Sequence, residues 1–534
     1  MNHTYEICLA LGVVVPLVSF FIIAVWGAAI GKPKASYIAL AAIGTCALLG
    51  VYVLLGWLNA DDAMRKTLAD NAFRYDWAVL GASTPITVGV KLDSLTVIMY
   101  FMVTFIAFWI HFFSIGYMEG HSDVVDGESK YHRFFAYLSL FCFSMLGLVV
   151  SSSLLFMFFF WELVGLCSYL LIGFYFDKKF ASDAGMKAFI VNRVGDFGFV
   201  IGLMLVILYL GTFDLDGAAR EFSTQAHSGS GIFASSINLF GWQVSGTMLA
   251  TLMGICLFCG AMGKSAQFPL HVWLPNAYAY APSMATAFLA ATATKVAVYL
   301  LLRYFFPVFG ASIIFTRLPV AEIFLVLSLA AMFGASIVAV FQDNVKRMLA
   351  YSSVAQIGYI TLGIAIENKT GLTGGIVHLF NHALIKGALF MAIGAVYYQI
   401  GSVKLDDLAG LGKRMPITMG AFVIAGFSII GVPGTVGFVS KWYLGLGAFE
   451  EGWWWLVFLL VASSLISVVY IGRIVEVVWF RPVSAAAKRA EEPPLSMLLP
   501  TLLLTAATVY FGLDTSLTAG IAERAAEWLL AGVR

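Results

Sequence analysis

Charged residues are scarce in this sequence. Only 11% of its 534 residues are Asp, Glu, Lys or Arg, against about 25% in a typical soluble domain. The formal net charge is +1, so no strong field of one sign favours nucleic acid as a partner. These shortages exclude an ordinary soluble domain and a nucleic-acid-binding protein.

Motifs for nucleotides, metals and redox groups are also missing. No GxGxxG follows a strand, and the segment 260–265 resembles a Walker loop without its strand–loop–helix setting. All six cysteines lie in apolar segments, and the CxxC formed by Cys256 and Cys259 has no second pair nearby to complete a four-ligand site. We therefore expect no cofactor or metal bound by this chain and no redox chemistry of its own, which leaves open whether it is part of an enzyme.

Apolar residues fill the chain instead. They make up 61% of it, and apolar stretches long enough to cross a bilayer recur from Ile7 to Leu513. Backbone polar groups find no water inside lipid, so these stretches predict helices. We predict an all-α polytopic membrane protein with about fourteen transmembrane helices, near residues 6–30, 37–58, 92–118, 134–152, 153–176, 184–211, 246–274, 283–306, 319–341, 348–366, 373–399, 416–447, 453–480 and 495–513.

The loops between these spans differ in basic residues. About fourteen lysines and arginines lie in the odd-numbered loops against about six in the even-numbered ones, and cytoplasmic loops carry the excess. The pattern predicts that both termini lie on the non-cytoplasmic side of the membrane. A bacterial inner membrane is the expected location.

Two spans are interrupted by helix-breaking residues, at 263–269 and at 431–434. Proline removes a helical hydrogen bond and glycine lowers helix stability. In lipid such breaks are tolerated where the freed backbone faces protein or a wet cavity. Matching breaks five spans apart predict two inverted five-helix repeats with an ion path between them; simple packing kinks are the alternative. The expected divisions are 1–133 (N-terminal helices and loops), 134–306 and 319–480 (the repeats), and 481–534 (the last helix and an amphipathic tail).

Ionisable residues stand inside the first predicted repeat. Glu162 lies in mid-span and Lys264 beside the first break, where charges are costly and usually functional. We expect these two to pair, since each lowers the cost of charging the other; a static ion pair between helices is the alternative. Arg193 and Asp196 are spaced i, i+3 and should pair with each other or with Glu162, as a structural support or as a switch.

The second half continues the series. Lys295 has apolar neighbours on all sides, and burial favours the neutral amine, which suits a proton carrier. His378, His382 and Lys386 are spaced i, i+4, i+8 and share a helix face that could pass protons along. Packing of satisfied polar groups is the alternative for this face, and a metal site lacks an acidic or cysteine partner.

Lys441 follows the second break and is the expected counterpart of Lys264. If it only needs to titrate, a glutamate in its place should serve better than an alanine. A lysine that snorkels to the membrane surface is the alternative.

Several of these motifs resemble one family. The segments 131–137, 161–175, 192–196 and 263–270 resemble the L-type antiporter-like subunit of respiratory complex I. Residues 431–442 are most similar to the D subunit of the Mrp cation/proton antiporters, and a lysine at position 295 is similar both to the M-type subunit of complex I and to the Mrp D subunit. Leu289 stands where the L-type subunit usually has a histidine, so the N-terminal half reads as L-type and the C-terminal half as Mrp D-like.

This resemblance implies fourteen helices in two inverted repeats, with protons passed along buried residues. Protons would enter at Glu162 and Lys264, cross the centre at Lys295 with His378 and His382, and leave at Lys441. The implied partners are the lipid bilayer, other membrane subunits, protons and, in some relatives, Na⁺. The expected function is a proton-translocating subunit of a complex I-like NADH:quinone oxidoreductase. The alternatives are a subunit of an Mrp-type Na⁺/H⁺ antiporter or a related ion-uptake assembly, and a scaffold that transports nothing.

Overall fold

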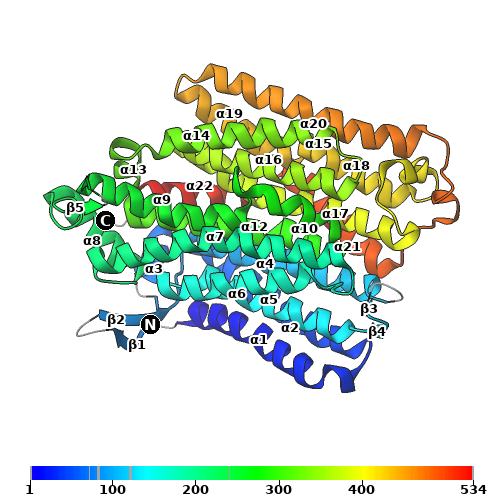
Figure 1. The fold of residues 1–534 in the computed structure, drawn as a ribbon, viewed down its shortest axis with the longest axis horizontal. Helices are drawn as coiled ribbons and strands as arrows, with labels where there is room; N and C mark the ends of the chain where they lie inside the picture. The colour runs from blue at the N-terminus through cyan, green and yellow to red at the C-terminus, as the bar shows by residue number, and fades with distance from the viewer. Residues whose placement is uncertain (1–2, 71, 81–83, 120–122, 240, 532–534) are drawn as a thin grey trace.

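The computed structural model describes residues 3–70, 72–80, 84–119, 123–239 and 241–531. Long helices lie side by side along one direction (Figure 1). Within the described residues, thirteen helices or joined helices are long and apolar enough to cross a membrane, and a bent pair, Leu405–Lys413 with Pro416–Ile430, gives a fourteenth. The predicted fold class is confirmed.

The thirteen spans apart from the bent pair are α1 (Thr4–Ile30), α2 (Lys34–Asn59), α4 (Ser94–Tyr117), α5 (Tyr131–Val150), α6 (Leu154–Ile172), α7 (Lys179–Leu210), α9 with α10 (Gly246–Tyr280), α11 to η3 (Ser283–Phe309), α14 to α15 (Val320–Val340), α16 (Val345–Ala365), α17 (Lys369–Ile400), α20 (Trp454–Phe480) and α21 (Leu495–Leu513).

Burial separates central helices from peripheral ones. The spans Ser283–Phe309 and Lys369–Ile400 are completely buried in their most apolar stretch. Helices α1, α2 and α20 instead present rows of exposed apolar side chains, as expected of surfaces that face lipid. The core of the molecule is therefore the pair formed by α17 and the span around Lys295, wrapped by the other helices.

Both predicted breaks are present. Helix α9 (Gly246–Ser265) ends at Ala266, whose φ is +55°, and the chain continues through η1 (Leu270–Trp273) into α10 (Leu274–Tyr280). Helices α18 (Pro416–Ile430) and α19 (Val436–Glu450) are separated by a turn in which Gly431 has φ of +93° and Gly434 φ of +85°. Each break lies close in sequence to a predicted site lysine, Lys264 at the first and Lys441 at the second.

The central span around Lys295 is irregular. Its helices α11 (Ser283–Phe288) and α12 (Thr294–Arg303) are joined by a π-helical turn, η2 (Leu289–Ala293). A second π segment, η3 (Tyr304–Phe309), follows α12 and contains Pro307. Such π turns loosen the hydrogen-bond ladder and are frequent at functional sites. Helix α12 is thus a ten-residue segment held between two wide turns.

Short elements gather at the two ends of the bundle (Figure 1). One end, called the hairpin end below, carries β1 (Arg74–Leu80) paired with β2 (Thr84–Gly89), helix α8 (Leu215–Ser228), and the start of α1. The strands β5 (Ser236–Leu239) and β6 (Trp242–Ser245) lie there too. The opposite end carries β3 (Val124–Val125) and β4 (Glu128–Ser129). The remaining helices are α3 (Asp62–Asp70), α13 (Ala311–Arg317) and α22 (Ser516–Ala531), and α22 packs against α17 and α4.

Candidate functional site

Glu162 forms an ion pair with Arg193. Glu162 lies midway along α6, and its Oε2 accepts a hydrogen bond from Arg193 on α7. The two side chains keep 24% and 42% of their surface exposed, so this pair lies at the edge of the helix bundle. Within the described chain, the second carboxylate oxygen, Oε1, is buried and has no hydrogen-bond partner. That free oxygen makes Glu162 the member of the pair that can accept a proton.

Lys264 pairs with Asp196 rather than with Glu162. Its Nζ lies 3.3 Å from Asp196 Oδ1 and donates to the Trp161 carbonyl at 2.6 Å. The Trp161 indole N–H also donates to Asp196, at 2.6 Å. Both ionic side chains are about 5% exposed. The expected direct pair between Glu162 and Lys264 is therefore wrong. The structure has two pairs side by side on α6, α7 and α9: Glu162–Arg193 at the edge of the bundle and Lys264–Asp196 in its interior.

Close packing of small residues fixes this arrangement. A Cβ on Gly165 would lie 3.2 Å from the Lys264 side chain, so glycine on α6 leaves room for it. Gly195 lies against the backbone of α9 in the same way. The i, i+3 spacing of Arg193 and Asp196 does place both on one side of α7, but each faces a different partner across the helix. Of the two expected outcomes for Arg193, pairing with Glu162 is the one observed.

Lys295 is held in the core by neutral hydrogen-bond acceptors. It is fully buried near the start of α12. Its ammonium donates to the Ala290 carbonyl in η2 and to Thr294 Oγ1 at 3.2 Å. No carboxylate within the described ranges forms an ion pair with it. The wide turn of η2 supplies the carbonyl that holds the amine, which gives the π segment a local role.

The histidine face of α17 contains one anchored and one free imidazole. His378 has Ser440 Oγ at 2.7 Å from Nδ1 and Gln356 Oε1 at 2.9 Å from Nε2. The ring of His382 stacks parallel to it, with centroids 5.9 Å apart. Both nitrogens of His382 are buried and find no hydrogen-bond partner in the part of the chain that the structure describes. The helix α17 packs against η2, which brings this face next to Lys295.

Lys386, one turn further on, is held by a separate set of acceptors. Its Nζ donates to the Leu349 carbonyl at 2.9 Å and to Ser352 Oγ at 3.0 Å. Tyr470 on α20 donates to the same serine hydroxyl. The predicted i, i+4, i+8 face is thus present, and all three of its members are buried.

Lys441 binds the second helix break. Its Nζ donates to the carbonyls of Ile429 and Ile430, at the end of α18, and to Ser464 Oγ, each at 2.9 Å. A cation there is favoured by the free carbonyls and the dipole of the helix end. The ammonium also lies 4.7 Å from the centre of the Tyr359 ring, and that ring contacts His378. Lys441 is therefore half-buried, with its ammonium bound to these groups of the protein, and does not snorkel to the surface.

A cluster of charges at the hairpin end was missed by the reading of the sequence. Arg303 on α12 forms a bidentate pair with Asp93, and Lys91 binds Asp216. Arginine inside an apolar span was a visible signal, because a charge there needs a partner. The partners themselves lie outside the apolar spans, with Asp93 just before α4 and Asp216 at the start of α8, where charged residues are ordinary.

No group of three or more His, Cys, Asp or Glu side chains that could hold a metal occurs among the described residues. The line from Glu162 to Lys441 contains carboxyl, amine and imidazole groups, which can hold or release protons. The architecture of the chain is that of a multi-pass helical membrane protein with two broken helices and a row of buried and half-buried ionisable groups.

Comparison with known proteins identifies the family. Residues 151–467 match the family described as "NADH:quinone oxidoreductase/Mrp antiporter, TM", and residues 77–135 match "NADH-Ubiquinone oxidoreductase (complex I), chain 5 N-terminus". The chain belongs to this family of antiporter-like membrane subunits.

Two relatives illustrate the match. The NADH-quinone oxidoreductase subunit L of Neisseria meningitidis serogroup A is 37% identical over 80% of this chain and 59% of its own length. The corresponding subunit L of Rickettsia bellii is 32% identical over 94% of this chain and 73% of its own length. The chain thus spans about three fifths of the Neisseria protein and nearly three quarters of the Rickettsia one.

Solved structures share the fold. A chain of the membrane-bound sulfane sulfur reductase, an archaeal respiratory membrane complex, superposes with a TM-score of 0.80 at 23% identity, covering 98% of both chains. A chain of the Mrp complex from Dietzia sp. DQ12-45-1b gives a TM-score of 0.79 at 21% identity, covering 99% of this chain and 98% of that one.

Proposed function

We propose that this chain is a proton-translocating membrane subunit of a complex I-like NADH:quinone oxidoreductase. The observation that carries the proposal is the row of ionisable side chains inside the spans, which runs from the partly exposed Glu162–Arg193 pair through the buried Lys295 to the half-buried Lys441. Such groups are costly in a membrane and mark ion pathways. The similarity to subunit L proteins supports the complex I-like assignment.

The proposed transfer begins at Glu162. A proton on its free oxygen removes the negative charge that holds Arg193, and the field at the neighbouring Asp196–Lys264 pair changes with it. Lys264 can then release or accept a proton according to that field. Each pair thereby sets the charge state of the next group.

The centre and exit of the path use the remaining residues. Lys295, without a carboxylate partner, would carry the proton as a buried amine, and His382, with both ring nitrogens free, would receive it. His378 and Lys441 would complete the transfer, and the hydroxyls of Ser464 and Tyr359, which lie beside the Lys441 amine, are the groups there that can exchange a proton. Lys386 would tune the charge on this face. Cofactor and quinone chemistry would belong to other subunits.

We further propose that residues 134–306 and 319–480 are inverted repeats and that the hairpin end faces the non-cytoplasmic side of a bacterial inner membrane. The two breaks, each beside a lysine with little or partial exposure, support the repeats. The excess of lysine and arginine in the loops of the opposite end supports the orientation.

Partner subunits are expected on the face of α6 and α7. The partly exposed Glu162–Arg193 pair lies there beside exposed apolar residues such as Val194 and Phe197. A charged pair facing hydrocarbon is costly, so we propose that a neighbouring membrane subunit covers it. The family's membership in multi-subunit complexes agrees with this expectation.

A subunit of an Mrp-type Na⁺/H⁺ antiporter is the second candidate. The specific observation in its favour is the shared fold with a chain of the Mrp complex over nearly the full length of both chains. In that case the same residues would exchange protons against Na⁺ moving the other way.

One experiment separates the two. The complex that copurifies with this chain is reconstituted into vesicles, and internal acidification is followed with NADH and quinone, or with a Na⁺ gradient alone. Acidification that requires NADH supports the first function. Acidification driven by Na⁺ without NADH supports the second, and no proton movement under either condition refutes both.

A further inference from the structure

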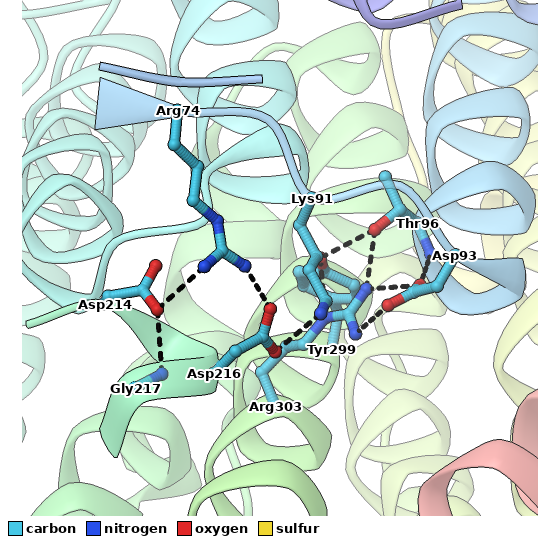
Figure 2. A network of polar contacts seen from close by, with 9 residues as sticks. All are labelled: Arg74, Lys91, Asp93, Thr96, Asp214, Asp216, Gly217, Tyr299 and Arg303. Atoms are coloured by element: carbon cyan, nitrogen blue, oxygen red, sulfur yellow. Dashed lines mark hydrogen bonds and ion pairs between the residues drawn. The ribbon is translucent and has the colours of Figure 1, made fainter. Parts of the chain in front are cut away.

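Six charged side chains form a balanced cluster at the hairpin end (Figure 2). They come from four separate segments: β1, the residues before α4, the start of α8 and the end of α12. Arg74 binds Asp214 at 3.1 Å and also Asp216, and Lys91 binds Asp216 at 2.6 Å. Arg303 binds Asp93 at 2.6 and 2.7 Å. Three cations and three carboxylates therefore neutralise one another.

Exposure falls in steps through this cluster. The Arg74 side chain is 31% exposed, Asp214 and Asp216 are 11% exposed, Lys91 is 5% exposed, and Arg303 is fully buried. The cluster thus runs from the protein surface into the core. A clamp that only tied loops together would not need this gradient, whereas a path for protons between water and the core requires one.

The inner end of the cluster lies on the helix of the central lysine. Lys295, Tyr299 and Arg303 are spaced i, i+4, i+8 and share one face of α12. Arg303 Nε donates to the Tyr299 hydroxyl at 2.9 Å. The distance from Lys295 to Arg303 along the helix axis is about 12 Å. The Tyr299 hydroxyl, which donates to the Val149 carbonyl at 2.6 Å, and the Thr96 hydroxyl lie at the inner end of the cluster.

Unpartnered polar atoms surround the outer end. Asp214 Oδ2 binds Arg74 and the Gly217 N–H, but within the described residues its buried Oδ1 has no hydrogen-bond partner. Within the same described residues, the buried hydroxyls of Ser152 and Ser153 have no hydrogen-bond partner either. The backbone of Ser153 pairs with that of Asp214, and the Ser152 carbonyl accepts from the Leu215 N–H, which places both serines beside Asp214. Buried polar atoms of this kind normally bind ordered water.

We propose that Asp214 is a proton-exchanging residue that connects the buried relay to the aqueous phase at the hairpin end. The inference rests on the proposed proton transport and adds a route that leaves the core along α12. The Asp214 carboxylate binds a proton from water and releases it through hydroxyl groups toward Tyr299 and Lys295, or runs the same transfer in reverse. Arg303 stays charged and does not carry the proton.

The electrostatics of the cluster distinguish its two outer carboxylates. Burial raises the pKa of Asp214 above its usual range, because Arg74 and the Gly217 N–H offset the burial only in part. Burial also acts on Asp216, but Lys91 and Arg74 outweigh it and hold the pKa of that carboxyl below its usual range. The other charges facing the pair are Asp93 before α4 and Arg303 on α12, while Trp528 of α22 stacks on Lys91 and Arg303.

The test uses the intact complex reconstituted in vesicles. Proton transport is measured from pH 5 to 8 for wild type, Asp214→Asn, Asp214→Glu and the control Asp76→Asn, which changes an exposed carboxylate on the same hairpin. Asp214→Asn should lower transport on the order of 100-fold, the lower end of what a positioned proton-transfer group contributes. Asp214→Glu should restore most of it, and Asp76→Asn should match wild type.

Two results overturn the inference. Transport by Asp214→Asn equal to that of Asp76→Asn would show that the carboxyl is not used, and equal loss of assembled complex in both Asp214 variants would show a structural role. If Asp214→Asn does not assemble, Arg74→Gln replaces it. Removal of the cation should shift the pH dependence of proton transport to higher pH, and an unchanged pH dependence contradicts the proposal. Loss of transport in Glu162→Gln beside normal transport in Asp214→Asn would reject this route and keep the proposed function.

Discussion

At the scale of single residues, the contacts decide what each ionisable group can do. In the described chain, Glu162 has one oxygen bound to Arg193 and one without a hydrogen-bond partner, whereas Lys264 and Asp196 are buried and bound to each other. Lys441 donates to two carbonyls and a hydroxyl. These differences turn a row of similar residues into groups with separate tasks.

Glu162→Gln should abolish proton transport while the complex stays assembled. The amide cannot ionise, so transport should fall by about 100-fold or more. Because Glu162 is partly exposed, loss of its pair should cost stability only about 1 kcal/mol or less. Transport in reconstituted vesicles and the thermal midpoint in detergent check both parts, with the exposed Glu491→Gln as control. Normal transport in Glu162→Gln would remove this residue from the path.

Lys441→Glu should be more damaging than Lys441→Ala. The simple need for a titratable group would favour glutamate, but the ammonium is bound by two carbonyls and a hydroxyl at a helix C-terminus, and a carboxylate there meets like partial charges. Thermal midpoints and transport rates of the two variants, with Lys441→Arg as the conservative reference, measure this. A glutamate variant that transports better than the alanine variant would contradict the fixed-sign role.

The sequence could show which ionisable residues lie inside the spans, but not which groups they pair with, and their role in proton transfer stays a prediction. Glu162, Lys264, Lys295 and Lys441 stand out because charge inside an apolar span is rare. The i, i+3 spacing placed Arg193 and Asp196 on one side of α7. Which of them meets Glu162 depends on how α6 and α9 pack on either side of α7. The spacing of residues along α7 does not contain this information.

At the scale of elements, spans were predictable and connections were not. Twenty apolar residues signal a span by themselves, so α21 agrees with the predicted 495–513 and most others begin and end within a few residues of the expected positions. The short elements α8 and β1–β2 were missed, because they are polar and too short for a clear period. Pro269 and Gly431 marked both breaks correctly.

Gly431→Ala should distort the second break. Its φ of +93° lies in a region where other residues cost about 1–2 kcal/mol, and a Cβ would lie 3.0 Å from the Lys441 side chain. We expect a lower thermal midpoint together with slower proton transport. Gly420→Ala is the matched control, since this helical glycine of α18 has open space around it and alanine favours helix. Equal behaviour of the two variants would contradict a special role for the turn.

At the scale of the whole molecule, the C-terminal helix holds distant parts together. Trp528 of α22 lies 5.2 Å from Lys91 and 5.6 Å from Arg303, measured from the ring centre. Arg74 and Asp214 in the same cluster are 140 residues apart. Contacts over such separations follow from the complete fold. The sequence could therefore predict an amphipathic tail at the position of α22, but not the residues against which that helix packs.

Trp528→Ala should loosen the hairpin end. Two cation–π contacts of about 0.5–1 kcal/mol each would be lost, together with the packing of a large ring. Trp528→Phe should keep most of the stability. Proteolysis rates of the hairpin end and thermal midpoints of the purified complex provide the measurement. The control is Lys369→Ala, which removes the ion pair between Lys369 on α17 and Glu523 on α22 and should have little effect on stability. If Lys369→Ala lowers the thermal midpoint as much as Trp528→Ala, the ring is not what holds α22.

The π segments on either side of α12 have a geometric consequence for Lys295. A π turn is equivalent to one residue inserted into an α-helix, and one residue corresponds to about 100° of rotation. If η2 became regular helix, α12 would turn by about that angle relative to α11, and the amine would lose the Ala290 carbonyl and point away from α17. The direction in which the Lys295 side chain points therefore depends on the one extra residue that the π turn η2 accommodates.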